Sequence, residues 1–278
     1  MKPGTESQTA VMVAAARAAA HGRTPVAAFT DPTALSLLPE KARQRVERHR
    51  DGVPPKGLGE KLQRKMLEGR MAMMVPRTVA IDSAIRDAAA PQVVILGAGL
   101  DGRAWRMPEL ADATVFEVDH PDSQRRKRER AAQLKPIAKD LRFVPVDFTR
   151  DRLDDALAGA GHDAGRPTTW VWEGVVMYLT LPEIEATLRV LQARSAPGSR
   201  LLILYTAPSA VRRVAGIVLG LIGEPFRSAF TAEQMRALLE RFDFTPAHDD
   251  DLRQIASRLG AEPTRLFKDV RLVTAARR

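Results

Sequence analysis

The pattern of apolar and polar positions changes about one third of the way along this 278-residue chain. Residues 1–88 have the pattern of helices, one of them expected to be capped by Asp31 and another expected to kink or break at Pro76. From residue 89 onward, continuous apolar runs alternate with helical segments, and such runs are typical of strands buried on both faces. The pattern predicts five buried strands, which lie within residues 92–99, 113–120, 141–148, 168–179 and 200–208.

Strands that alternate with helices indicate an α/β protein with a doubly wound, mostly parallel sheet. The last two predicted strands, near 245–250 and 268–278, are expected to form an antiparallel C-terminal edge. We divide the chain into an N-terminal helical cap, residues 1–88, and a Rossmann-like core, residues 89–278. An apolar insertion near 207–230 is predicted to form a lid over the core.

The composition excludes several kinds of site. The chain has no cysteine, which rules out disulfides, thiolate metal sites and a cysteine nucleophile, and we expect no metal. No apolar stretch is long enough to span a bilayer and no segment resembles a signal peptide, so we expect a cytoplasmic protein without a membrane partner. The net charge of +9 includes a basic cluster at 124–130, which we interpret as a solvated helix face and not as a nucleic-acid site.

A glycine-rich loop follows the first predicted strand. Gly97, Gly99 and Gly102 match the G-x-G-x-x-G pattern of dinucleotide sites, where glycine lets a ligand approach the backbone. Asp101 lies in the same loop, and its carboxylate would repel a pyrophosphate by roughly 4 kcal/mol at about 4 Å and an effective dielectric constant of about 20. A ligand with an ammonium and a sulfonium but no phosphate avoids this repulsion. The loop therefore favours S-adenosylmethionine over a dinucleotide.

Carboxylates end the next three predicted strands. Glu117 and Asp119 end the second strand, where either can accept hydrogen bonds from ribose hydroxyls, although NAD enzymes also place an acid there. Asp147 ends the third strand and can accept the adenine amino group, with Phe148 packing on the ring. Glu173 ends the fourth strand and is expected near the methionine end of the cofactor. The alternative role is a helix cap for the two aspartates and a core position for Phe148.

Five segments at compatible spacing resemble the leucine carboxyl methyltransferase family, and most closely its bacterial branch of S-adenosylmethionine-dependent O-methyltransferases. These segments are PRTVAIDSAI, VVILGAGLDGRAWRM, VFEVDHP, FVPVDFTRD and WVWEGVVMYLT, and they are spread over most of residues 77–190. The resemblance implies a class I methyltransferase fold and the cofactor S-adenosyl-L-methionine. It implies that Arg77 holds the cofactor's carboxylate, that Gly97 is the loop glycine and that Asp119 binds the ribose. It also implies that Asp147 and Phe148 form the adenine site and that Glu173 is the family's acid after the fourth strand.

The family also has a basic residue near its N-terminus that touches the cofactor, and Arg23 lies in the comparable region of this chain. The resemblance implies a small-molecule acceptor, and the predicted apolar lid indicates a fairly hydrophobic one that is methylated on a carboxylate or a hydroxyl. Tyr178 and Tyr205 follow the fourth and fifth strands and are candidates for catalytic residues in the acceptor pocket, with packing as the alternative. The five histidines are scattered, which favours a carboxylate acceptor because a carboxylate needs no general base.

Two other functions compete with this interpretation. The glycines and Asp119 also suit an NAD(P)-dependent oxidoreductase. The basic cluster at 124–130 suits a non-catalytic cofactor-binding or RNA-binding protein that kept the fold. The sequence does not indicate an oligomeric state.

Overall fold

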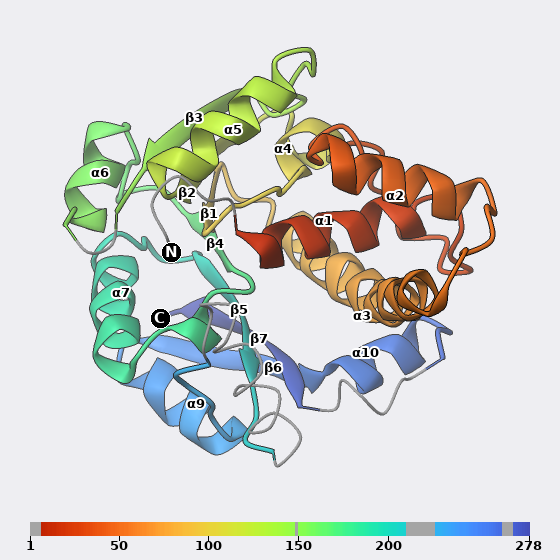
Figure 1. The fold of residues 1–278 in the computed structure, drawn as a ribbon. Coiled ribbons are helices and arrows are strands. Elements are labelled where there is room, and N and C mark those ends of the chain that lie inside the picture. The colour runs from red at the N-terminus through yellow and green to blue at the C-terminus, as the bar shows by residue number, and fades with distance from the viewer. Residues whose placement is uncertain (1–6, 148–149, 210–225, 263–268) are drawn as a thin grey trace.

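The computed structural model describes residues 7–147, 150–209, 226–262 and 269–278. At its centre lies a seven-stranded sheet with the order β3-β2-β1-β4-β5-β7-β6 (Figure 1). The pairings from β3 to β5 are parallel, whereas β7 is antiparallel to both of its neighbours. The mostly parallel sheet and its antiparallel C-terminal edge are therefore confirmed. The strands are β1 (Gln92–Leu96), β2 (Thr114–Asp119), β3 (Asp140–Pro145), β4 (Thr168–Trp172), β5 (Arg200–Thr206), β6 (Phe244–Asp251) and β7 (Val270–Arg277).

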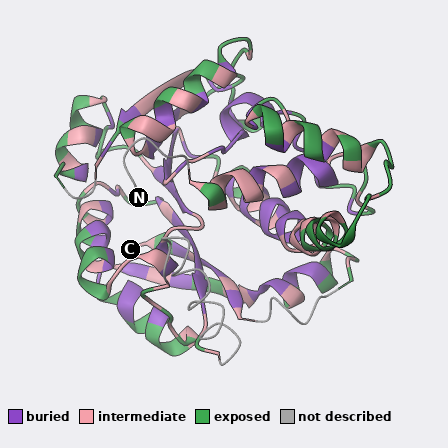
Figure 2. Cartoon of the chain, viewed as in Figure 1, coloured by how far each residue is buried: buried purple, intermediate pink, exposed green. Residues whose placement is uncertain are grey.

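Helices cover both faces of the sheet, as the continuous apolar strands require. Figure 1 shows α1, α2, α3 and α10 on one side of the sheet and α6, α7 and α9 on the other. Every residue of β1 and β4 is buried, and Figure 2 shows the same burial along the centre of the sheet. The helices are α1 (Gln8–Ala20), α2 (Glu40–Arg50), α3 (Leu58–Ala88), α4 (Arg103–Arg106), α5 (Pro121–Ala131), α6 (Leu153–Gly159), α7 (Leu181–Ala193), α9 (Ala232–Glu240) and α10 (Leu252–Arg258).

The N-terminal helices share a hydrophobic core with the sheet. Ala14 of α1, Leu37 of the turns before α2 and Val46 of α2 belong to the same buried cluster as Val93 and Ile95 of β1. The division of the chain at residue 88 stays a prediction. The lid also stays a prediction, because residues 210–225 lie outside the described part of the chain. No helix in the described ranges is long and apolar enough to cross a bilayer.

The structure contradicts the predicted helix cap at Asp31 and a break of the helix at Pro76. Asp31 does not begin a helix: residues 32–37 form successive turns, and the Asp31 carboxylate accepts the amide of Ala34 and the hydroxyl of Thr33. Short polar side chains favour such turns because they replace the backbone acceptor. The helix α3 is not broken at Pro76, which lies inside its 31 residues. Packing of its buried C-terminal half offsets the hydrogen bond that proline cannot make.

The strand order places the chain reversal between β1 and β4. The connections lead outward from β1 toward β3 and outward from β4 toward β5. In doubly wound sheets such a reversal marks a crevice at the carboxyl ends of the strands. Ligands of doubly wound proteins bind at this position. The glycine loop, Asp119 and Glu173 all follow strands that end at this edge.

Candidate functional site

The glycine loop is packed tightly against two other segments. Gly97 has a φ of +66°, and a Cβ there would collide with the side chain of Val175 in the loop after β4. A Cβ on Gly102 would collide with the hydroxyl of Thr33 in the N-terminal turns. The first glycine therefore lets the loops after β1 and β4 meet, and the third admits the N-terminal segment.

Asp119 binds the glycine loop through its side chain. Its carboxylate accepts the amide of Gly99, across the ends of β1 and β2, and the amide of His120 at 2.6 Å. Burial raises the pKa of Asp119, and these two amide hydrogen bonds oppose that rise. The cap of α5 is His120, whose Nδ1 accepts the amide of Asp122, so Asp119 does not have the capping role.

Glu117 does not lie where a ribose can reach it, which corrects its prediction as a cofactor ligand. Its side chain is completely buried, and its Oε2 binds Nζ of Lys127 on α5 at 2.7 Å. Burial raises the pKa of Glu117 to about 7, although Lys127 acts in the opposite direction. Strand alternation places Glu117 and Asp119 on the same face, but only Asp119 is at the strand end.

Asp101 is neutralised within the protein, so the predicted repulsion of a pyrophosphate was wrong. Its carboxylate accepts the backbone amide of Arg103 at 2.7 Å and forms an ion pair with the Arg103 guanidinium. Burial raises the pKa of Asp101, but Arg103 and Arg17 outweigh it, and the net pKa is lowered. The carboxylate therefore presents no uncompensated charge to a ligand in the loop.

Arg103 also binds Glu173, the acid that follows β4. Its Nη1 donates to Oε2 of Glu173 at 2.9 Å, while Nε of Arg77 on α3 binds the other oxygen. Burial alone would raise the pKa of Glu173, but Arg77 and Arg103 hold it well below its usual range. Glu173 is thus a carboxylate held by two arginines from segments on either side of the crevice.

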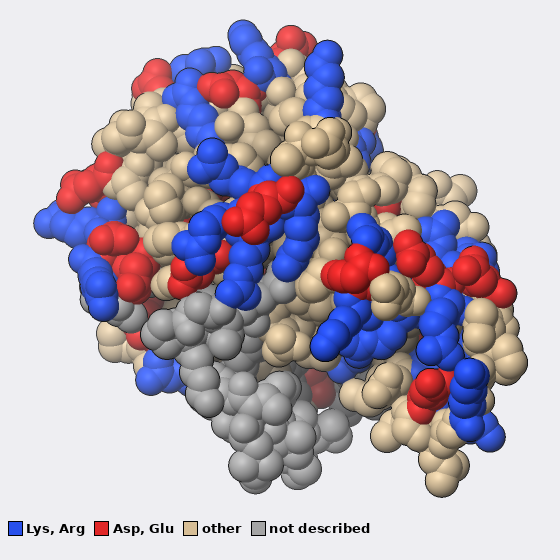
Figure 3. Space-filling model, turned by 45° about the horizontal axis from the view of Figure 1, so that its top comes forward, with Lys and Arg blue, Asp and Glu red and all other residues tan. Residues whose placement is uncertain are grey.

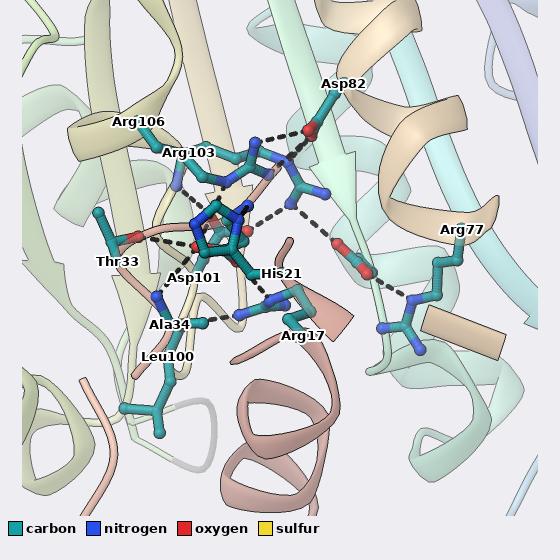
Figure 4. Close-up of polar contacts among 12 residues, drawn as sticks. Arg17, His21, Thr33, Ala34, Arg77, Asp82, Leu100, Asp101, Arg103 and Arg106 are labelled. Carbon is teal, nitrogen blue, oxygen red and sulfur yellow. Dashed lines mark hydrogen bonds and ion pairs between the residues drawn. The ribbon is translucent and has the colours of Figure 1, made fainter. Parts of the chain in front are cut away.

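The ion pairs continue from Arg103 into the N-terminal region. The carboxylate of Asp82 on α3 lies 2.7 Å from Nε of Arg103. It accepts hydrogen bonds from both terminal nitrogens of Arg106, at 2.6 and 3.0 Å. Arg106 lies 3.7 Å from Asp31, which in turn lies 2.9 Å from Nε of Arg17 on α1 (Figure 4). The connected series contains four arginines and four carboxylates, so its formal charges balance.

Arg17 is the N-terminal basic residue that the structure brings to the glycine loop. Its Nη2 donates to the carbonyl of Leu100 at 2.6 Å, and its side chain is buried. Arg23, which the resemblance suggested, is exposed. Sequence analysis missed Arg17, Asp82, Arg103 and Arg106. The available signal was the arginine pair in GRAWR directly after the glycines, on a short helix with apolar neighbours.

Asp147, Phe148 and Tyr178 are the next of the predicted site residues. Asp147 lies at the end of β3, where its amide binds Asp151 at 2.8 Å, while Phe148 lies outside the described residues. Tyr178 ends a short 3₁₀ helix after β4 and stacks on Phe226, with ring centroids 5.7 Å apart.

Tyr205 is fully buried in β5, which favours the packing role over a place in the acceptor pocket. Its hydroxyl donates to Asp249 at 2.7 Å and accepts from Arg271 at 3.0 Å. Burial and the bond to Asp249 raise the pKa of Tyr205.

The basic cluster at 124–130 is not simply a solvated helix face. Lys127 is buried against Glu117 and lies 5.1 Å from the ring centre of Trp105, and Gln124 binds two backbone carbonyls. These inward contacts remove part of the feature on which an RNA-binding function rested. Among the described residues, no group of three or more histidines and acids is placed to hold a metal ion.

Comparison with known proteins shows the family of this chain. The sequence model of the leucine carboxyl methyltransferase family matches residues 10–192. A Frankia alni protein, named as an S-adenosyl-L-methionine-dependent methyltransferase, is 34% identical over 78% of this chain and 74% of its own length. A protein of the same name from a Mycobacterium species is 37% identical over 69% of this chain and 64% of its own length.

A solved structure from Thermobifida fusca, described as a methyltransferase, has a TM-score of 0.59 with 16% identity over 95% of this chain and 94% of its own. At that identity the likeness shows the fold, and the family match together with the sequence relatives shows the family. The chain belongs to the leucine carboxyl methyltransferase family and is an S-adenosylmethionine-dependent methyltransferase.

Proposed function

We propose that this enzyme transfers the methyl group of S-adenosylmethionine to a carboxylate oxygen of a small, fairly hydrophobic acid. The sulfonium is already a good leaving group, so the protein contributes mainly by positioning the two reactants. A carboxylate acceptor is ionised at neutral pH and needs no general base. A phenol or alcohol needs a base within hydrogen-bond reach.

The observation that supports a carboxylate acceptor is the state of Glu173. Arg77 and Arg103 bind its two oxygens and lower its pKa, which makes it a weak base. Tyr205 is engaged by Asp249 and Arg271, and its raised pKa opposes formation of a tyrosinate. Neither Glu173 nor Tyr205 therefore suits proton removal at neutral pH.

Three of the five histidines have side-chain partners among the described residues. His21 and His120 accept backbone amides through Nδ1, and His162 is buried against Thr168 at 3.0 Å. Burial lowers the pKa of His162 to about 4, and that residue lies beyond α6, away from the glycine loop. The positions of these rings are consistent with a reaction that uses no histidine base.

The site residues fit the cofactor in their donors and acceptors. Arg77 uses Nε for Glu173, and its two terminal nitrogens make no hydrogen bond to the described residues. Figure 4 shows a dashed line at only one nitrogen of Arg77. That fork matches the carboxylate of the methionine moiety. Asp119 would accept the ribose hydroxyls and Asp147 the adenine amino group. The bound cofactor supplies an electrophilic methyl group on sulfur.

Two measurements test this proposal. Calorimetric titration with S-adenosylmethionine, S-adenosylhomocysteine and NAD should show binding of the two adenosyl ligands only, with loss of binding in Asp119→Ala. For a carboxylic acceptor, the rate should stay flat from about pH 6 to about pH 9, because neither the acceptor's carboxyl group nor the cofactor's sulfonium titrates in that range. A rate that falls below about pH 7, or turnover of phenols but not acids, would show that a base is used.

A further inference from the structure

The N-terminal half of α3 presents an apolar stripe to solvent. Leu58, Leu62 and Met66 are 86%, 61% and 46% exposed, and they are three of the six exposed large hydrophobic residues found among the described residues. Their spacing of four places them on one side of the helix. Figure 2 shows this end of α3 as largely exposed, in contrast to its buried C-terminal half. We call these three residues the α3 stripe.

Lysines flank the α3 stripe along one edge. At 100° per residue, Lys61 and Lys65 lie next to Leu58, Leu62 and Met66 on the helix surface. Both lysines are exposed, and neither side chain forms an ion pair or hydrogen bond with the described residues. Long lysine stems cover apolar surface while their ammonium groups reach outward.

The acids nearby do not cancel this positive charge. Glu60 faces Arg48 at 3.4 Å and Glu68 faces Arg64 at 3.6 Å, so each is already opposite an arginine. Residues 40–70 contain ten Lys and Arg against five Asp and Glu, a net charge of +5 out of +9 for the whole chain. Figure 3 shows basic side chains interspersed with acidic ones on the right of the molecule, where Figure 1 places α2 and α3.

We propose that the α3 stripe and its flanking lysines bind the surface of an anionic lipid membrane. An exposed apolar face bordered by lysines is the combination by which a surface helix inserts at the headgroup boundary while its cations meet anionic lipids. The binding is peripheral, and it therefore agrees with the lack of a membrane-spanning helix among the described residues.

A second copy of the chain is a poorer occupant for this face. A two-fold interface places the same patch of each subunit against itself. It would bring two segments of net charge +5 together, which is unfavourable at short range. An anionic surface has the complementary charge, and this complementarity selects the lipid.

Membrane binding at this face would also place the site near the bilayer. The same helix carries Arg77 and Asp82 of the buried ion-pair series in its C-terminal half. Met66 and Arg77 are eleven residues apart, which corresponds to about 16 Å along an α-helix. The proposal does not depend on the identity of the acceptor, because it concerns a surface separate from the site.

Vesicle flotation with the full chain tests the proposal. Phosphatidylcholine vesicles would be compared with vesicles that also contain phosphatidylglycerol, at low and at high salt. We expect binding to the anionic vesicles that weakens with salt, and little binding to phosphatidylcholine alone. Lys61→Glu/Lys65→Glu and Leu58→Ser/Leu62→Ser/Met66→Ser should each weaken binding about tenfold or more.

A matched pair of single variants controls for general surface hydrophobicity. Met66 and Leu181 are both 46% exposed, but Leu181 lies at the start of α7. Met66→Ser should weaken vesicle binding, whereas Leu181→Ser should not. Affinity for S-adenosylhomocysteine should be unchanged in every variant, which shows that each is folded.

Three results would overturn the proposal. The first is failure of the unaltered protein to bind anionic vesicles. The second is equal loss of binding in Leu181→Ser and Met66→Ser. The third is a dimer in sedimentation analysis that the triple serine variant converts to monomer, since a second copy would then cover the stripe.

Discussion

Arg103 donates from Nη1 to Oε2 of Glu173 at 2.9 Å, although 70 residues separate the two in the sequence. This bond joins the helix after the glycine loop to the end of β4, so it spans the crevice where the strand order reverses. Arg103 also binds Asp101 and Asp82, and only 1% of its surface is exposed. One guanidinium thus organises three carboxylates around the glycine loop.

Replacing Arg103 should destabilise the protein more than most substitutions. In Arg103→Met, three buried carboxylates lose a partner, and breaking a buried pair costs about 3–5 kcal/mol. In Arg103→Lys the charge remains, but a single ammonium cannot reproduce the fork, so we expect a smaller loss of about 1–3 kcal/mol. Urea unfolding measures both losses, and titration with S-adenosylhomocysteine should show weaker binding in Arg103→Lys.

An exposed arginine provides the control for this experiment. Arg86 pairs with Glu109 at 2.5 Å on the surface, where such pairs contribute about 0–1 kcal/mol. Arg86→Lys should therefore leave both stability and cofactor affinity close to those of the unaltered protein. Equal effects of the two lysine substitutions would contradict the central position given to Arg103.

Substitution of Arg77 should weaken recognition of the cofactor's carboxylate specifically. Arg77→Lys replaces a planar fork by one ammonium, and we expect S-adenosylhomocysteine to bind about tenfold more weakly, or about 1.4 kcal/mol. The ligand 5′-methylthioadenosine lacks the amino acid end and should bind the variant within about twofold of the unaltered protein. An equal loss for both ligands would mean that Arg77 acts on the whole site through Glu173.

Features that depend on a short stretch of sequence were predictable. Features that depend on residues brought together from distant parts of the chain were not. The apolar run of β1, the following glycines and the acids Asp119 and Glu173 are each readable within a short window, and the sheet follows from their order. Asp101 was read as an unpaired charge because its partner Arg103 acts through a bond that only the folded loop creates. The pattern shows that a charge is present but does not show what opposes it.

Two further residues illustrate the same limit. Asp31 has the sequence of a helix cap, yet its carboxylate lies between Arg17 and Arg106, which come from segments 14 residues before it and 75 residues after it. Glu117 and Asp119 are equivalent in sequence at the end of β2. Glu117 lies two residues before the end of the strand, where it is buried and paired with Lys127 of the next helix. Tertiary contacts decide these roles, and propensity does not include them.

Glu117 should make the protein less stable as the pH rises through the weakly acidic range. Its pKa is raised from 4.5 to about 7 in the folded state, mainly by burial. Between these values the folded protein holds a proton that the unfolded chain has lost, so the free energy of unfolding falls as the pH increases. The change amounts to roughly 3 kcal/mol.

Comparison with Glu117→Gln isolates this effect. Relative to that of the variant, the unfolding free energy of the unaltered protein should decrease between about pH 5 and about pH 8. Glu109→Gln should show no such trend in this range, because the hydrogen bond from Arg86 lowers the pKa of Glu109 below its usual value of 4.5, and Glu109 is therefore ionised in both the folded and the unfolded protein. If the difference for Glu117→Gln does not vary with pH, Glu117 stays ionised and paired with Lys127 throughout this pH range, and the prediction is wrong.

Tyr205→Phe should lower stability without affecting catalysis. The substitution removes a hydroxyl that bonds Asp249 and Arg271, but these two residues remain paired at 2.9 Å, so we expect a loss of only about 1 kcal/mol. Since Tyr205 is fully buried, kcat and the acceptor KM should stay within about twofold of the unaltered enzyme. Tyr178→Phe is the comparison, because Tyr178 is partly exposed just after β4. If kcat falls more than about tenfold in Tyr205→Phe while the fold is intact, the hydroxyl participates in methyl transfer and its assignment to packing is wrong.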